Sequence, residues 1–303
     1  MNAGRRYGRR APRRAIRPPR ELPWSGAVLA VLTLAGCTAG GATDASSEAL
    51  PAGVTVELKQ LRSDVAARQA QVTVVNGTDE TLTIGAIQVH DPRFEESAER
   101  VRDRESRIAA GAAVAIPVQL APVTCPAPDD ASATVTIEWS TGRTAGSATA
   151  DLPDPLSFVP PLHERECRAA ELAEAADVSL SSFAPSAAGT PADLTLTIDP
   201  TGRAAAAVDG IQTTNLLTWS ESVGQLYPIA VRVREGDTEA IDVHLPLMPL
   251  RCDPHAVQED KRGTIFTLEV EVEGQPGEIE LPATEEMRGR ILKWVAQWCG
   301  FGG

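Results

Sequence analysis

The feature that most constrains the fold of this chain is an internal repeat marked by a recurring cysteine motif. Residues 53–168 can be aligned with residues 176–300, and the clearest match sets residues 118–125 against residues 245–252. Both segments contain the pattern Leu-x-Pro-x-x-Cys after a run of alternating apolar residues, and each copy ends with a further cysteine. Self-similarity over this length indicates one structural unit that is built twice.

Most segments of both copies alternate apolar and polar residues, which is the pattern of antiparallel strands with one buried face. Residues 265–272 show it best, because apolar side chains stand at positions 266, 268, 270 and 272. Gly, Pro, Asn and Asp bound these segments at short intervals, as turns require. The pattern resembles immunoglobulin-like and fibronectin-like domains. We therefore expect an all-β fold of two tandem antiparallel β-sandwich domains, each with a short helical segment.

Three segments depart from the strand pattern. Thr284 is a suitable N-cap for a helix over residues 285–298, whose apolar side chains share one face that is expected to dock on the second sandwich. Residues 162–176 are rich in Ala and Glu and predict a short helix that carries Cys167. Residues 95–106 are highly charged, and we expect a solvated loop or short helix there.

Four cysteines remain in the chain beyond residue 37, namely Cys125, Cys167, Cys252 and Cys299. An even number of cysteines suggests disulfides where a chain is exported from the cytoplasm, and the count alone allows three pairings. Pairing within each copy is the simplest assignment that the repeat offers. It predicts the disulfides Cys125–Cys167 and Cys252–Cys299.

The amino-terminal segment has the features of an export signal. Residues 1–22 contain eight arginines and one acidic residue, and a short apolar run follows over residues 26–34. That run is too short for a membrane span, which needs about 20 apolar residues. Residues 34–37, Leu-Ala-Gly-Cys, resemble the lipobox of bacterial lipoproteins, in which the cysteine receives a diacylglycerol and the preceding peptide bond is cut. The resemblance implies that Cys37 becomes the lipidated first residue of the mature protein.

The leader also fits an ordinary secretory signal that has a cysteine nearby by chance. Residues 12–17 partly resemble the twin-arginine export signal, so the sequence does not decide between Sec and twin-arginine export. A start codon placed too far upstream would also account for the long basic region.

These observations predict five segments in the chain. Residues 1–36 form the lipoprotein signal peptide, residues 37–52 a flexible tether, and residues 53–168 the first sandwich. Residues 169–176 form a linker, and residues 177–303 form the second sandwich with its carboxy-terminal helix. Cleavage before Cys37 leaves about 267 of the 303 residues, enough for two ordinary cores.

The charge of the mature chain excludes one class of partner. Subtracting the eight leader arginines from 28 basic residues leaves 20, and subtracting Glu21 from 41 acidic residues leaves 40, so the net charge is near −20. Nucleic acid is therefore not expected as a partner, since phosphate binding needs a basic surface.

The composition also indicates the kind of genome that encodes the chain. Few lysines with abundant Ala, Arg, Gly and Pro are typical of high-GC genomes. Together with the lipobox, this composition indicates an actinobacterial protein.

The sequence contains no recognisable catalytic or cofactor motif. Nucleophile elbows, zinc-protease helices, acylation motifs and phosphate loops are all missing, so we expect neither an enzyme nor a cofactor. The only weak candidates for a metal site are His244, Met248 and His255, whose side chains suit copper. Because Cys252 is needed for a disulfide and the first copy has no equivalent ligands, we expect no metal site there.

The remaining conspicuous residues are given structural roles. His163 is expected at a solvated helix start, and Trp219, Trp294 and Trp298 as apolar anchors of the core. The function predicted from these features is that of a lipid-anchored protein on the outer face of the cytoplasmic membrane. It would bind or scaffold another envelope protein without catalysis. The alternatives are extracytoplasmic copper handling and a cryptic or accessory hydrolase.

Overall fold

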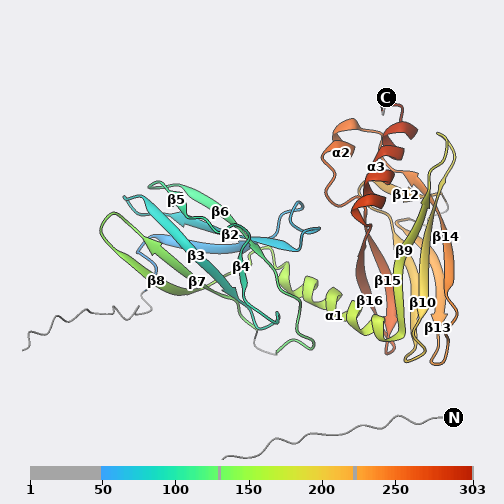
Figure 1. Ribbon diagram of the computed structural model, residues 1–303, viewed down its shortest axis with the longest axis horizontal. Helices are drawn as coiled ribbons and strands as arrows, with labels where there is room; N and C mark the ends of the chain where they lie inside the picture. Colours follow the sequence, from blue (N-terminus) through green and yellow to red (C-terminus); the bar gives the residue numbers. More distant parts are fainter. Residues whose placement is uncertain (1–48, 129–130, 221–223, 302–303) are drawn as a thin grey trace, which may run out of the picture. The chain divides into compact units, whose positions relative to one another are not determined.

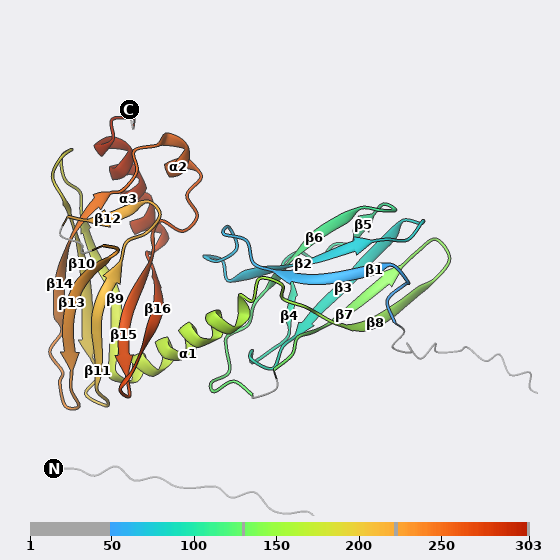
Figure 2. The same cartoon turned by 180° about the vertical axis from the view of Figure 1, so that it is seen from behind.

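The computed structural model describes residues 49–128, 131–220 and 224–301, which form strands β1–β16 and helices α1–α3 (Figures 1 and 2). The predicted signal peptide, the lipidation site Cys37 and most of the predicted tether lie outside these residues. Within the described ranges, no helix combines the length and the apolar character that a membrane crossing requires. Strands dominate, so the fold is mostly β, as the alternating pattern predicts.

Eight strands form one antiparallel sheet in the amino-terminal half. Their order is β1-β2-β6-β4-β3-β7-β8, and β5 pairs with β3. The strands are β1 (Val54–Lys59), β2 (Gln69–Asn76), β3 (Leu82–His90), β4 (Ala98–Arg100), β5 (Ser106–Ile108), β6 (Ala113–Gln119), β7 (Thr134–Ser140) and β8 (Ala145–Asp151). The side chains that alternate inward from these strands, among them Val72, Val74, Ile84 and Ile137, are fully buried and form one hydrophobic core.

The short strand β4 joins two layers of this sheet. It pairs with β3 through Val89 and Ala98, and with β6 through Arg100 and Val118. Without β4, the sheet divides into the triplets β1-β2-β6 and β3-β7-β8. The expectation of a solvated loop over residues 95–106 is therefore correct for residues 95–97 and 101–105, which are exposed, and wrong for residues 98–100, which form β4. Backbone pairing on both sides, with Ala98 buried in the core, outweighs the charged composition of the segment.

The carboxy-terminal half contains two four-stranded antiparallel sheets, β12-β14-β10-β9 and β13-β11-β15-β16. Their strands are β9 (Ala176–Ala184), β10 (Ala192–Pro200), β11 (Ala206–Gln212), β12 (Leu217–Trp219), β13 (Leu226–Val233), β14 (Ile241–Pro249), β15 (Ile265–Val272) and β16 (Gln275–Pro282). Both sheets contribute to a second hydrophobic core, with Leu194 from one and Phe266 from the other. Two sheets that share one core are a β-sandwich.

The strand pairing of the first half recurs in the second. The triplet β9-β10-β14 repeats β1-β2-β6, and β11-β15-β16 repeats β3-β7-β8. The register also shifts at matching places, between Ile84 and Ile87 in β3 and between Val208 and Gly210 in β11. The two copies differ in their connecting strands, because β4 bridges the two triplets of the first copy whereas β12 and β13 stay in separate sheets.

Three helices complete the described chain: α1 (Val159–Ala175), α2 (Pro254–Gln258) and α3 (Glu285–Trp298). Helix α1 contributes Val159 and Leu162 to the first core and Leu172 and Ala175 to the second. The residues predicted as a linker, 169–176, are thus the last part of α1 and the first residue of β9. A helix that is buried at both ends connects the two copies.

Helix α3 begins where the sequence predicts. The hydroxyl oxygen of Thr284 accepts a hydrogen bond from the backbone N–H of Met287 at 3.2 Å, which is the N-cap interaction. Met287, Ile291, Trp294 and Val295 are buried in the second core, so the apolar face docks on the sandwich. The burial is consistent with the spacing of these residues along one face of the helix.

Two disulfides tie the helices to the sheets. Cys125, after β6, is bonded to Cys167 in α1, and Cys252, after β14, is bonded to Cys299, the C-cap residue of α3. This is the pairing that the repeat predicts. The closed loops span 42 and 47 positions, so each bond constrains a long segment of the unfolded chain.

Candidate functional site

The residues considered for copper binding do not form one cluster. His244 and Met248 lie on the same face of β14, and four residues of a strand separate their Cα atoms by about 13 Å. The His244 side chain is instead turned to Asp193 on β10, with Nδ1 3.0 Å from Oδ2. The structure therefore does not assemble this pair into a metal site.

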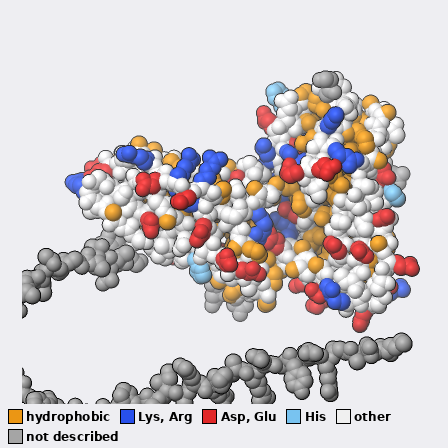
Figure 3. Space-filling model, in the orientation of Figure 1, with side chains coloured by type: hydrophobic (Ala, Val, Ile, Leu, Met, Phe, Trp, Pro, Cys, Tyr) orange, Lys and Arg blue, Asp and Glu red, His pale blue; other side chains and the backbone are white. Residues whose placement is uncertain are grey.

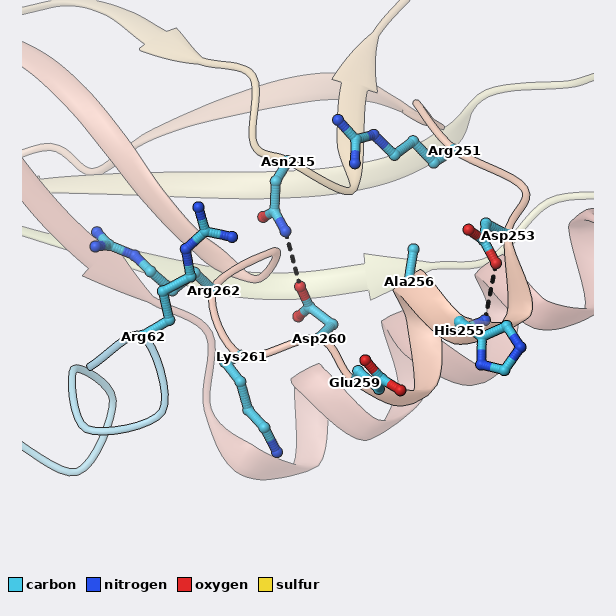
Figure 4. A pocket seen from close by; sticks show the side chains of 10 residues that line it. All are labelled: Arg62, Asn215, Arg251, Asp253, His255, Ala256, Glu259, Asp260, Lys261 and Arg262. Carbon is cyan, nitrogen blue, oxygen red and sulfur yellow. Dashed lines mark hydrogen bonds between the residues drawn. The ribbon is translucent and has the colours of Figure 1, made fainter.

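His255 lies in a different element, the short helix α2, and lines a pocket of about 340 Å³ (Figure 4). The helix starts at Asp253, whose Oδ1 accepts a hydrogen bond from the backbone N–H of His255 at 2.9 Å. Pro254 occupies the first position of the helix, where its missing N–H is not needed. The neighbouring disulfide at Cys252 attaches this segment to α3.

A buried carboxylate organises the base of the pocket. Asp260 is only 3% exposed, and its two oxygens accept hydrogen bonds from the backbone N–H of Gly263 at 2.8 and 2.9 Å. Asn215 donates a further bond at 3.3 Å, which Figure 4 shows as a dashed line. A Cβ atom at position 263 would lie 2.5 Å from the Cβ of Leu216. Only glycine therefore fits against Asp260.

The rim of the pocket offers positive charge. Within the described ranges, neither Arg251 nor Lys261 forms an ion pair, and Figure 4 shows these two side chains on opposite sides of the pocket. Arg262, in contrast, is paired with Glu280 at 2.6 Å. The rim also carries two acids, namely Glu259 and Asp253, whose carboxylate accepts a backbone hydrogen bond. Unpaired guanidinium and ammonium groups such as those of Arg251 and Lys261 are strong hydrogen-bond donors to anions.

The tryptophans have the structural roles that the sequence predicts for anchors. Trp219 and Trp294 are buried in the second core, where Trp219 packs on Phe266 with ring centroids 5.7 Å apart. The indole N–H of Trp298 donates to the carbonyl oxygen of Thr190 at 3.2 Å, and its ring is half-buried. Trp294 and Trp298, which lie on α3, hold that helix on the sandwich.

A cluster that the sequence pattern does not predict surrounds the first disulfide. The expectation that His163 lies at a solvated helix start is wrong, because the structure places it in the interior with 7% of its surface exposed. Its Nε2 lies 2.8 Å from the carbonyl oxygen of Thr124 and 3.4 Å from Sγ of Cys167. The signal in the sequence is the spacing of His163 and Cys167, because residues four apart share one face of a helix.

Charged groups of both signs are mixed on the face that Figure 3 shows, so that face has no field of a single sign.

The pKa of one arginine is shifted inside the fold. Burial, together with the positive charge of Arg104, lowers the pKa of Arg100 on β4 from its ordinary value. Of its guanidinium nitrogens, only Nη2 has a partner, the hydroxyl oxygen of Ser106 at 2.7 Å.

The fold and the cysteines define a mostly β, sandwich-like protein with two intrachain disulfides. No protein-family model and no curated protein matches the chain. Among solved structures it is similar to the YadV chaperone, with 14% identity over 76% of this chain and 100% of that chain and a TM-score of 0.23. It is also similar to the CupB2 chaperone of Pseudomonas aeruginosa, with 8% identity over 73% of this chain and 95% of that chain and a TM-score of 0.21. The match to red sea bream transglutaminase has 8% identity over 78% of this chain and 32% of that chain, with a TM-score of 0.22. Scores at this level identify neither a family nor a function.

Proposed function

We propose that this chain is an extracytoplasmic binding protein, anchored through Cys37 to the outer face of the cytoplasmic membrane, whose pocket beside α2 binds an anionic group of an envelope partner. The resemblance of residues 34–37 to a lipobox supports the anchor. The proposal includes two tandem immunoglobulin-like sandwiches as the frame. Loops on rigid sheets are a common place for binding residues.

The observation that carries the binding proposal is the distribution of charge in the pocket. The chain as a whole is strongly acidic, yet Arg251 and Lys261 face the same pocket with no ion-pair partner among the described residues. Asp253 and Asp260 accept hydrogen bonds from backbone N–H groups, and among the described residues neither forms an ion pair with Arg251 or Lys261. A carboxylate or phosphate of a partner would therefore find free cationic donors.

The surroundings of the pocket favour binding by a preformed site. Arg251 directly precedes Cys252, so the disulfide to Cys299 limits the movement of this rim. On the opposite rim, Lys261 directly follows Asp260, which is held by Gly263 and Asn215. Groups that are ordered before binding lose less conformational entropy when a ligand arrives.

In-cell cross-linking of the anchored protein, followed by mass spectrometry, tests this function. We expect one dominant envelope protein to be captured by the natural chain and lost with the variant Arg251→Ala/Lys261→Ala. The matched control is Arg102→Ala/Arg104→Ala, which removes the same charge from an exposed loop. Equal capture by the pocket variant would exclude the pocket, and no specific capture by the natural chain would exclude the binding role.

The anchor is tested separately. Cys37→Ala removes the thiol that would carry the lipid, so the protein should move from the membrane fraction to the soluble fraction of broken cells. Mass spectrometry of the natural protein should find a diacylglycerol on an amino-terminal Cys37. Unchanged retention of the Cys37→Ala protein in the membrane fraction would contradict the lipid anchor.

A further inference from the structure

We propose that reduction of the Cys125–Cys167 disulfide opens a metal site in which the two thiolates and the imidazole of His163 bind Zn²⁺ or Cu⁺. This site is separate from the pocket beside α2 and does not depend on the proposed binding function. It also involves none of the residues that the sequence suggested for copper. Thiolate and imidazole together are a donor set that suits both ions.

The three ligand atoms are already close to one another. One sulfur or nitrogen atom of each residue lies within 4.8 Å of the others, and this is the one such group of three among the described residues. In a tetrahedral zinc site, bonds of about 2.3 Å to sulfur and 2.0 Å to nitrogen place these two atoms about 3.5 Å apart. Sγ of Cys167 lies 3.8 Å from Nδ1 of His163. The pair therefore has nearly the required separation before any ion is bound.

The imidazole is also oriented as a ligand. Nε2 of His163 lies 2.8 Å from the carbonyl oxygen of Thr124, and a carbonyl can only accept a hydrogen bond. Nε2 therefore carries the proton of the neutral ring, which leaves the lone pair of Nδ1 for a metal ion. Metal-binding histidines usually donate their other ring N–H to a backbone carbonyl or carboxylate in this way.

The exposure of the cluster determines how it would open. Cys125 is exposed whereas His163 is buried, so a thiolate from an external dithiol reaches Sγ of Cys125 first. That attack forms a mixed disulfide and releases the Cys167 thiolate beside the imidazole, which lies 3.4 Å away at Nε2. The second thiol of the reductant then displaces Cys125. The dithiol loses two electrons and becomes a disulfide, and metal binding to both cysteines releases two protons to water.

The second copy provides a natural comparison. The residue four positions before Cys299 is Val295, which is buried and offers no ligand atom. Sγ of Cys299 lies 4.0 Å from the carbonyl oxygen of Arg251, which is not a nitrogen ligand. Reduction of Cys252–Cys299 would therefore release two thiols without a nitrogen ligand. His163→Val converts the first cluster to the arrangement of the second.

The test uses the mature chain with Cys37→Ala in two forms, each keeping one pair of cysteines while the other pair is replaced by serine. Each protein is reduced with a dithiol, freed of it without oxygen, and titrated with Co²⁺ and then Zn²⁺. The form that keeps Cys125 and Cys167 should show the thiolate-to-cobalt absorption band, and Zn²⁺ should abolish it. The form that keeps Cys252 and Cys299 should bind at least about tenfold more weakly, as should His163→Val in the first form.

Three results would overturn the proposal. The first is the absence of a cobalt band in the first form when both of its thiols are counted as free. The second is equal affinity in the two forms or in the His163→Val protein. The third does not depend on the His163→Val protein: X-ray absorption of the zinc-loaded first form should find two sulfur ligands and a histidine nitrogen, and a spectrum without that nitrogen contradicts the site.

Discussion

Arg68 and Glu166 form a two-pronged ion pair that joins the turn before β2 to helix α1. Nε of Arg68 lies 2.8 Å from Oε1, and Nη2 lies 2.5 Å from Oε2. Nη1 also donates to the carbonyl oxygen of Leu120 at 3.0 Å, just beyond the end of β6. The backbone φ of Arg68 is 53°, which lies in the left-handed region that residues other than glycine seldom adopt. These three hydrogen bonds hold Arg68 in place, and the two to Glu166 connect it to α1.

A double-mutant cycle measures this ion pair. With Arg68→Met and Glu166→Gln, we expect a coupling free energy of about 1 kcal/mol in urea unfolding, because the pair is bidentate and partly buried. The same cycle on Arg203 and Glu174, which are mostly exposed, is expected to give about 0 to 0.5 kcal/mol. Coupling at Arg68 that is no larger than this control value would show that packing, not the ion pair, fixes the helix.

Removal of either disulfide should destabilise the protein by a similar amount. The bonds close loops of 42 and 47 positions, so the chain-entropy estimate is about 4 kcal/mol for each. Urea unfolding of Cys125→Ser/Cys167→Ser and of Cys252→Ser/Cys299→Ser, each against the oxidised natural chain, measures the two losses. A loss well under about 1 kcal/mol for either pair would contradict the estimate and show that packing alone holds that helix.

Replacement of Arg100 should not destabilise the fold, although the residue lies on the strand that joins two layers. Its Nε and Nη1 atoms are buried without a hydrogen-bond partner. Burial and the charge of Arg104 lower the pKa of Arg100, so its charged form is less favourable in the folded state than in the unfolded state. This penalty is present at neutral pH and is relieved only as the pH rises through the lowered pKa.

Arg100→Met keeps the apolar stem and removes the charge. We expect the free energy of unfolding to stay the same or to rise by about 1 kcal/mol, measured by urea unfolding at pH 7. Arg107→Met is the matched control, since Arg107 is exposed on the neighbouring strand β5 and should change stability by less than about 0.5 kcal/mol. A loss above about 1 kcal/mol in Arg100→Met would show that the bond to Ser106 outweighs the burial cost.

Asp260 should be the most sensitive position of the pocket. Asp260→Ala leaves the N–H of Gly263 buried without its acceptor, and we expect a loss of about 2 to 3 kcal/mol in the free energy of unfolding. Glu259→Ala, at the exposed neighbouring position, should change it by less than about 0.5 kcal/mol. Thermal and urea unfolding of both proteins distinguish them, and equal effects would contradict the structural role of Asp260.

The sequence predicted much of the fold because the relevant signals are local. Alternation with a period of two marked strands such as β15, and the N-cap Thr284 marked the first turn of α3. The repeat set the pairing of Cys125 with Cys167 and of Cys252 with Cys299, since a unit built twice places equivalent cysteines in equivalent positions. These features depend on neighbours a few residues away or on a second copy of the same pattern.

The candidate sites depend on contacts between distant segments, which the sequence does not display. The charged residues 95–106 predict a solvated loop, yet β4 lies there because β3 and β6 offer backbone partners on both sides. The sequence predicts that His163 is exposed, but in the structure its ring lies against the carbonyl oxygen of Thr124, a residue 39 positions earlier in the chain. Local pattern therefore predicted most of the strands and the N-cap of α3, and the internal repeat predicted the cysteine pairing. Only tertiary packing decided which polar side chains are buried together, because burial depends on what long-range folding brings alongside them.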